Sequence, residues 1–206
     1  MITFYYVRHG TTLGNLESRL VGNTESPLAP EGIQNAKDAS LALRNTVLTK
    51  AYYSPMSRAK DTAMIVLEGH EQVPAFAADE LVEWHFGKYE GVVHPTHQED
   101  VDARIKGNGF ADQGGESREE FRERIRRGFE RIVRETADGE RVLIASHGFY
   151  YVEMLEALCG RKVRDAYMSD KKTICPVPNG GISVFVYDHG VFRIERFAED
   201  PREWKP

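Results

Sequence analysis

An arginine beside a histidine is the first feature of this sequence that could do chemistry. Arg8, His9 and Gly10 come directly after residues 2–7, an apolar, β-branched and aromatic run that is typical of a strand buried on both faces. In open α/β sheets, ligands bind beyond the carboxyl ends of the strands, which is where these residues would lie. An arginine, a histidine and a glycine that permits close backbone approach predict a site for an anion such as a phosphoryl group. Polar residues that merely close a strand would explain the tripeptide equally well.

A second arginine is predicted to lie near the first. Residues 49–53 predict another short strand, and Ser54 and Pro55 are suited to the N-cap and the first position of a helix. Arg58 then falls in the first turn of that helix. The free N–H groups and the dipole of a helix N-terminus attract anions, so an arginine there would reinforce a phosphate site. An ordinary surface charge would explain Arg58 as well.

The opening pattern recurs in the second half of the chain. Residues 141–145 predict a third buried strand, which ends in a serine followed by His147 and Gly148. Three strand ends would then bring two arginines and two histidines to one crevice. Paired arginines can hold phosphoryl oxygens in bidentate fashion, and a neutral histidine can act as a nucleophile.

A proton donor would fit the stretch over residues 79–91. This stretch is dense in carboxylates, aromatic side chains and glycines, a mixture that can place an acid in partly apolar surroundings. Such surroundings raise the pKa of a carboxyl group, so that it can donate a proton near neutrality. A solvated acidic turn would have the same composition.

Further patterns predict the elements that position the crevice. A polar loop over residues 16–29 would border the site, and residues 73–78 predict a short strand. One helix begins at Pro30, and the longest helix begins with a capping box of Ser117 and Glu120. The predicted buried stripes are Ile33, Ala36, Ser40, Leu43 and Val47 on the first helix, and Phe121, Ile125, Phe129, Ile132 and Val133 on the second.

The sequence also predicts the surface of the longest helix and the elements at the end of the chain. Arginines and glutamates alternate over residues 118–134, which predicts a salt-bridged solvent face. An apolar helix is predicted over residues 149–158. Residues 182–187 and 191–197 predict a hairpin whose last strand lies at a sheet edge.

Length and composition bound the class of protein. The 206 residues predict a single domain over 1–206, with residues 92–115 as a cap segment. A net charge of −5 argues against nucleic acid or an anionic membrane as the partner. The sequence has no run of 18 apolar residues and opens directly into the first predicted strand, so a cytoplasmic location is expected.

Cysteine and histidine usage gives little support for a metal. Cys159 and Cys175 are interpreted as structural or incidental, since no Cys-x-x-Cys pair is present and a cytoplasmic disulfide is not expected. His94 and His97 have Pro95 between them and no third ligand at a helpful spacing, so no metal site is predicted there.

Five motifs occur in order along nearly the whole chain. They are Arg8-His9-Gly10-Thr11-Thr12-x-x-Asn15, Ser54-x-x-x-Arg58-Ala59-x-x-Thr62-Ala63, Leu81-x-Glu83-x-x-x-Gly87-x-x-Glu90-Gly91, Gly115-Glu116-Ser117 and Ser146-His147-Gly148. Together they resemble the histidine phosphatase superfamily, in its phosphoglycerate-mutase-like branch. Val21 departs from the pattern, because several related phosphatases carry a glutamine at this position.

The resemblance implies an α/β fold, a three-layer α/β/α sandwich with a mainly parallel central sheet and one antiparallel edge strand. It also implies a phosphohistidine intermediate, in which His9 attacks phosphorus while Arg8, Arg58 and His147 hold the phosphoryl oxygens. Glu83 would protonate the leaving oxygen and then activate water. The further residues implied at the phosphate site are Asn15, Thr12, Gly22 and Gly148.

Several functions stay open at this level. The short chain and the compact segment over residues 92–115 favour a metal-independent phosphomonoester hydrolase for a small phosphorylated metabolite, because cofactor-dependent mutases usually carry a longer insertion there. The second reading is a phosphoglycerate mutase, for which 2,3-bisphosphoglycerate would serve as phosphoryl primer; otherwise no cofactor is expected. A non-catalytic phosphoryl-binding module and a metal-dependent hydrolase that uses His94, His97 or His85 as ligands stay open as well. The oligomeric state is open, with a homodimer among the options.

Overall fold

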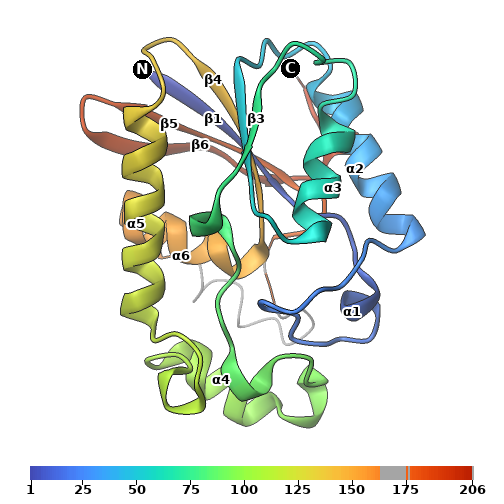
Figure 1. Cartoon of the computed structure of the whole chain (residues 1–206), viewed down its shortest axis with the longest axis vertical. Helices are drawn as coiled ribbons and strands as arrows, with labels where there is room; N and C mark the ends of the chain where they lie inside the picture. Colours follow the sequence, from blue (N-terminus) through green and yellow to red (C-terminus); the bar gives the residue numbers. More distant parts are fainter. Residues whose placement is uncertain (163–174, 176, 206) are drawn as a thin grey trace.

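A mixed six-stranded sheet, mostly parallel, forms the centre of the computed structural model, which describes residues 1–162, 175 and 177–205 (Figure 1). The strands are β1 (Ile2–Arg8), β2 (Lys50–Tyr53), β3 (Ala75–Ala77), β4 (Arg141–Ser146), β5 (Ile182–Asp188) and β6 (Val191–Glu199), in the sheet order β3-β2-β4-β1-β5-β6. The helices of the described residues are α1 (Leu13–Leu16), α2 (Pro30–Leu43), α3 (Ser57–Val66), α4 (Gln98–Lys106), α5 (Arg118–Arg134) and α6 (Gly148–Cys159). The α/β class and the mostly parallel sheet are confirmed. The predicted antiparallel edge strand is wrong in its place: the strand that opposes the others is β5, second from the edge, because β5 is antiparallel to both β1 and the edge strand β6.

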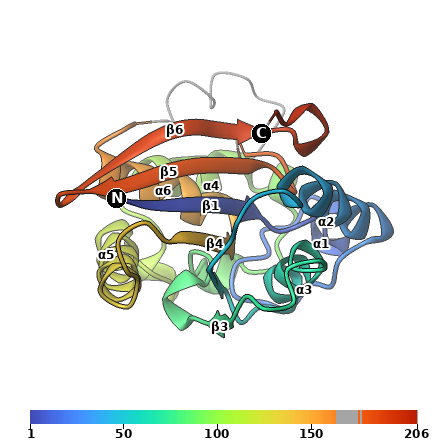
Figure 2. The same cartoon turned by 90° about the horizontal axis from the view of Figure 1, so that it is seen from above.

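Helices cover both faces of this sheet (Figure 2). Alternation along β1 sends Phe4 and Tyr6 into the core beneath α5 and α6, whereas Val7 packs against α2 and α3 on the opposite face. Phe4, for example, meets Phe129 of α5 edge to face, with ring centroids 5.8 Å apart. These two cores account for the near-continuous apolar sequence of the central strands.

The strand register brings three chain segments together at one end of the sheet. Arg8 at the end of β1 stands opposite Ser146 at the end of β4, and Tyr53 at the end of β2 stands opposite Ala145. His9 and His147, the next residues after β1 and β4, are therefore level with each other, and Ser54, the next residue after β2, lies one residue short of them. α1 and α4 lie beyond this end of the sheet (Figure 1).

The helix after β2 begins later than the sequence predicts. α3 starts at Ser57 with Met56 as its N-cap, and Ser54 is not the capping residue. The Ser54 hydroxyl is instead paired with the imidazole of His147, 2.8 Å away. Because the start moves by less than one turn, Arg58 still lies in the first turn of α3.

The buried face of α2 also differs from the prediction. Gly32, Ala36, Ala39 and Leu43 are buried, whereas Ile33 is 40% exposed and Val47 lies beyond the end of the helix. The cause is a close backbone approach: a Cβ on Gly32 would stand 1.9 Å from the carbonyl oxygen of Thr11. This contact fixes which side of α2 faces the sheet.

The predicted capping box is confirmed: Ser117 and Glu120 form it at the start of α5. Gly160, in the left-handed conformation, ends α6. Of the predicted α5 stripe, Phe121, Ile125, Phe129 and Ile132 are buried, and Val133 is half-buried.

Residues 92–115 contain α4 and two short 3₁₀ turns. Val101, Ile105 and Phe110 of this segment are buried in the core that also contains Trp84. Phe110 meets the Trp84 ring edge to face at 5.6 Å. None of the described helices is long and apolar enough to cross a membrane.

Candidate active site

A cavity of about 320 Å³ opens at the carboxyl ends of β1 and β4. Its position agrees with the general rule for ligand sites in open α/β sheets. Most residues singled out from the sequence line it. The lining residues are Arg8, His9, Asn15, Ser18, Arg19, Leu20, Val21, Gly22, Arg58, Glu83, Phe86, Gly148, Phe149, Cys175, Val177, Pro178 and Asn179.

His9 is held with one ring nitrogen free for chemistry. Its Nδ1 lies 2.8 Å from the carbonyl oxygen of Gly10. Because a carbonyl oxygen can only accept, Nδ1 carries the proton and Nε2 keeps its lone pair. Burial lowers the pKa of His9 well below its usual value, and the charges of Arg58 and Arg8 lower it further. The imidazole is therefore neutral near pH 7.

Two of the three described arginines that line the cavity, Arg8 and Arg58, are tied to the backbone and still have donors to spare. Arg58 donates from Nη1 to the Thr24 carbonyl at 3.0 Å and from Nη2 to the Gly22 carbonyl at 2.6 Å, and Arg8 donates to the Val177 carbonyl. The buried Nε atoms of Arg8 and Arg58 have no hydrogen-bond partner among the described residues. A buried unpaired donor is costly, so both guanidinium groups are suited to an anionic ligand. Burial lowers the pKa of Arg58 to about 10, and it stays charged near neutrality.

His147 lies against His9, with ring centroids 5.2 Å apart and planes inclined by 63°. Its Nε2 is 2.8 Å from the Ser54 hydroxyl, and its buried Nδ1 has no partner within the described part of the chain. Burial lowers the pKa of His147 well below its usual value, with the charge of Arg58 as the next cause. His147 is fully buried and stands behind His9, not in the cavity wall.

The Glu83 carboxyl group is bound by three backbone N–H groups. Oε1 accepts from Trp84 at 2.9 Å and Tyr150 at 2.7 Å, and Oε2 accepts from Phe149 at 3.0 Å. The last two donors belong to the free N-terminus of α6. Burial raises the pKa of Glu83 above its usual value. A carboxylate has about four lone-pair sites, so one site stays open for a proton.

The remaining predicted residues divide between the cavity and its support. Asn15, Gly22 and Gly148 line the cavity, whereas Thr12 does not. Thr12 is fully buried and serves as the N-cap of α1, in a reciprocal capping box with Asn15. Its hydroxyl is therefore occupied by the protein.

Three features of the site are not predicted by the sequence patterns. Asn179 donates from Nδ2 to the His9 carbonyl at 3.0 Å, and only its place in an Asn-Gly-Gly turn marks it. Ser54 has the pattern of a helix cap and not of a partner for histidine. Cys175, interpreted as structural or incidental, lines the cavity so close to Gly148 that a Cβ there would stand 2.5 Å from its sulfur.

The histidines of a metal-dependent hydrolase do not assemble. His85 lies 3.6 Å from Glu90, His94 pairs with Asp102 at 3.3 Å, and His97 contacts a threonine hydroxyl. Within the residues that the structure describes, no group of three or more His, Cys, Asp or Glu side chains is arranged to hold a metal ion.

Comparison with known proteins decides the family. The family model described as "Histidine phosphatase superfamily (branch 1)" matches residues 4–200. The chain belongs to this superfamily. Within it, the chain is a phosphoglycerate-mutase-like enzyme.

Relatives in this superfamily include both mutases and phosphatases. The chain is 31% identical over 156 residues to a "2,3-bisphosphoglycerate-dependent phosphoglycerate mutase 2" of Gloeobacter violaceus, covering 72% of this chain and 71% of that protein. It is 32% identical over 151 residues to an "Adenosylcobalamin/alpha-ribazole phosphatase" of Salmonella typhimurium, covering 69% and 72%. Among solved structures, a phosphoglycerate mutase from Bacillus anthracis superposes with a TM-score of 0.82 at 25% identity, covering 98% of this chain and 94% of that one. These histidine phosphatase relatives act on small phosphorylated metabolites.

Proposed function

We propose that this histidine phosphatase hydrolyses phosphomonoesters of small metabolites through a phosphohistidine on His9, without a metal ion. The observation that carries the proposal is the Gly10 carbonyl on Nδ1 of His9, which leaves Nε2 unprotonated in a cavity that also contains Arg8, Arg58 and Glu83. A neutral nucleophile, cationic oxygen-binding groups and a carboxyl group with a raised pKa are what phosphoryl transfer to histidine needs.

In the first step, Nε2 of His9 forms a bond to phosphorus as the ester P–O bond breaks. The proton on Glu83 moves to the leaving oxygen, which departs as an alcohol. Arg8 and Arg58, which line the cavity, stabilise the charge on the phosphoryl oxygens, and the buried His147 packs against the ring of His9. In the second step, the Glu83 carboxylate takes a proton from water, the water oxygen attacks phosphorus, and the P–N bond breaks. Phosphate leaves, and both residues return to their starting protonation states.

The lining of the cavity favours hydrolysis over mutase chemistry. Its side chains include Leu20, Val21, Phe86 and Phe149, which suit the uncharged part of a substrate. A phosphoglycerate mutase must also hold a carboxylate. Among the described lining residues, the remaining cation is Arg19, whose guanidinium bonds to Glu17 at 2.5 Å and to the Gly91 carbonyl at 2.8 Å.

The mutase remains the second candidate, because a mutase stands among the relatives at 31% identity. It would use the same residues but return the phosphoryl group to a substrate hydroxyl. Its phosphoryl primer would be 2,3-bisphosphoglycerate.

Phosphorus NMR separates the two. The protein is incubated in the presence of a chelator with 3-phosphoglycerate and a trace of 2,3-bisphosphoglycerate, and in parallel with a panel of phosphomonoesters. Release of inorganic phosphate is expected for members of the panel. Formation of 2-phosphoglycerate without phosphate release would overturn hydrolysis in favour of the mutase. Loss of phosphate release on addition of the chelator would overturn the metal-independent mechanism.

A further inference from the structure

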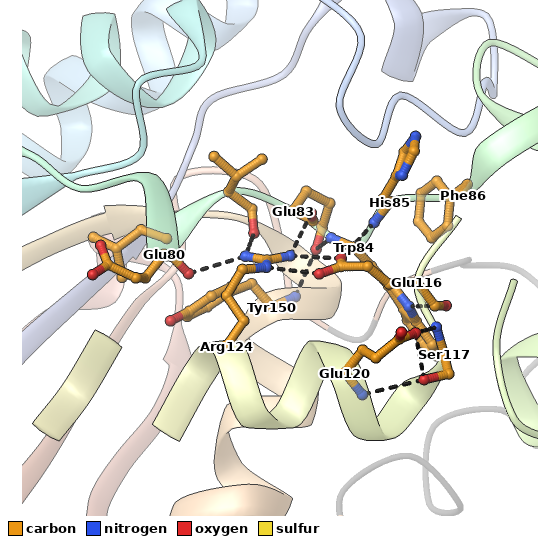
Figure 3. A network of polar contacts seen from close by, with 12 residues as sticks. Glu80, Glu83, Trp84, His85, Phe86, Glu116, Ser117, Glu120, Arg124 and Tyr150 are labelled. Atoms are coloured by element: carbon orange, nitrogen blue, oxygen red, sulfur yellow. Dashed lines mark hydrogen bonds and ion pairs between the residues drawn. The ribbon is translucent and has the colours of Figure 1, made fainter. Parts of the chain in front are cut away.

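Arg124 of α5 has an unusually complete set of hydrogen bonds. An arginine offers five N–H donors, and five bonds are formed. Nε donates to Glu116 Oε1 at 2.8 Å, Nη1 to the carbonyls of Glu80 and Val82 at 3.0 and 2.7 Å, and Nη2 to the Glu83 carbonyl at 3.1 Å and to Glu116 Oε2 at 2.7 Å. Figure 3 shows this guanidinium between the segment that carries Glu83 and the Glu116 side chain.

The segment held in this way is the one that presents Glu83. It forms a single 3₁₀ turn, Asp79–Leu81, followed by irregular chain, so regular backbone pairing does not fix it. Arg124 binds its carbonyls from one side, and the Ser146 hydroxyl binds the Leu81 carbonyl at 2.7 Å.

Glu116 binds the same segment at the two residues that follow Glu83. While paired with Arg124, its Oε2 also accepts from the backbone N–H of His85 at 3.0 Å. Its carbonyl accepts from the indole N–H of Trp84 at 3.0 Å, and its N–H donates to the His85 carbonyl at 2.9 Å. Residues on both sides of Glu83 are therefore bound to one Arg–Glu pair.

Arg124 affects where Glu83 lies and makes no direct contact with its carboxyl group. The polar contacts of the Glu83 carboxyl group are with the N–H groups of Trp84, Phe149 and Tyr150, and Arg124 reaches only the Glu83 backbone. The charge of Arg124 is matched by the bidentate carboxylate of Glu116.

We propose that Arg124, together with Glu116, is the positioning residue for the general acid Glu83. This inference rests on the proposed phosphohydrolase function. A lysine could keep the ion pair, but its three donors radiate from one atom and cannot reach three carbonyls and a carboxylate at once. Misplacing a catalytic group by about 1 Å can cost about 100-fold in rate.

The test compares two leaving groups. A p-nitrophenolate leaves without a proton, whereas an alkoxide needs one from Glu83. The measurement is kcat/KM for p-nitrophenyl phosphate and for an alkyl phosphate, since this parameter reports the steps up to formation of the phosphohistidine. The alkyl-to-aryl ratio is taken within one protein preparation, so a change in the folded fraction cancels.

Arg124→Lys is expected to lower the alkyl-to-aryl ratio about 10- to 100-fold, in the direction of Glu83→Gln. Glu116→Gln is expected to lower it less, because the amide keeps one acceptor. Arg126→Lys is the matched control: it lies on the same helix but pairs with the exposed Glu119 and Glu123 at 2.9 and 3.4 Å, and its ratio should equal that of the unmodified enzyme.

Two results would overturn the inference, and they are distinguishable. If Arg124→Lys and Glu116→Gln lose stability or overall activity but keep the unmodified ratio, the pair supports the fold and does not position Glu83. If the unmodified enzyme hydrolyses neither ester, the proposed function itself fails. An alkaline limb of the kcat/KM profile that moves in Arg124→Lys and not in Arg126→Lys would support the positioning role.

Discussion

The two halves of the cavity are built in different ways. The phosphoryl-binding half takes Arg8 and His9 from a strand end and Arg58 from the first turn of a helix, with His147 from another strand end packed behind His9. The acid half takes Glu83 from irregular chain that is held by hydrogen bonds to Arg124, Glu116 and the N-terminus of α6. The first half is placed by sheet pairing, whereas the second depends on a few polar contacts.

This difference predicts different sensitivities. Changes in the phosphoryl-binding half should slow all phosphomonoesters alike, because every substrate presents the same phosphoryl group. Changes in the acid half should slow substrates in proportion to their need for a proton on the leaving oxygen. Variants in each half can therefore test the division.

The largest effect is expected for His9→Ala. Removing the nucleophile should lower kcat for alkyl and aryl esters equally, by about 10⁴-fold or more. Acid-quenched samples of the unmodified enzyme should contain alkali-stable phosphohistidine, and the variant should contain none. Labelling that persists in the variant would assign the nucleophile to another residue.

Glu83→Gln should lower the rates for alkyl and aryl phosphates to different extents. Loss of the general acid is expected to cost about 10²- to 10⁴-fold in kcat/KM for alkyl phosphates and much less for p-nitrophenyl phosphate. Steady-state kinetics on both esters measures the split. An equal loss of kcat/KM for both esters would show that Glu83 has a structural role and does not transfer the proton.

The pH dependence of kcat/KM should have one limb for each half of the cavity, an acid limb from His9 and an alkaline limb from Glu83. The reactive form has a neutral His9 and a protonated Glu83. Because the pKa of His9 is lowered, kcat/KM should fall on the acid side only below the usual histidine range near pH 6.5. Because the pKa of Glu83 is raised, the alkaline fall should lie above the usual glutamate range, at about tenfold per pH unit once Glu83 is ionised.

Glu83→Gln should abolish the alkaline limb and keep the acid limb. The second ionisation of the phosphomonoester, near pH 6, is the same for both proteins and cancels in the comparison. An alkaline limb that persists in the variant would contradict the assignment.

The smallest effect is expected for Ser54→Ala. Its hydroxyl pairs with Nε2 of the fully buried His147 at 2.8 Å, and losing such a bond costs about 1 kcal/mol, or about fivefold in rate. The loss should be the same for alkyl and aryl esters. Ser57→Ala, whose hydroxyl faces the exposed Glu25, is the control and should leave kcat/KM unchanged. A loss confined to alkyl esters would break the proposed division between the halves.

The arginines of α5 show where interpretation of the sequence reaches its limit. Their alternation with glutamates predicts a solvent face, which is right for Arg126 but wrong for Arg124, whose side chain is only 15% exposed. The two lie two positions apart on the helix and differ in what packs against them. Nothing within α5 indicates that Glu80 and Val82, more than 40 positions earlier, present their carbonyls there.

The sequence by itself determined the parts that depend on neighbours in the chain. Apolar runs predicted the central strands, Ser117 and Glu120 predicted the start of α5, and the ordered motifs predicted the family. The strands and the helix start arise from local backbone preferences and from the period of burial, which adjacent residues carry. The family was predicted from the resemblance of the motifs alone. The predicted positions of His9 and Arg58 in the cavity followed from a strand end and from the start of a helix, respectively.

Tertiary structure alone decided which partners those residues meet. Ser54 pairs with His147 instead of capping α3, Cys175 enters the cavity wall, and Arg124 holds the backbone of Glu83. These contacts join residues that are far apart in the chain, so their geometry depends on strand register and helix docking. The sequence shows that a side chain is polar, but the fold decides its hydrogen-bond partner. A buried donor or acceptor must pair with whichever group the packing brings within reach.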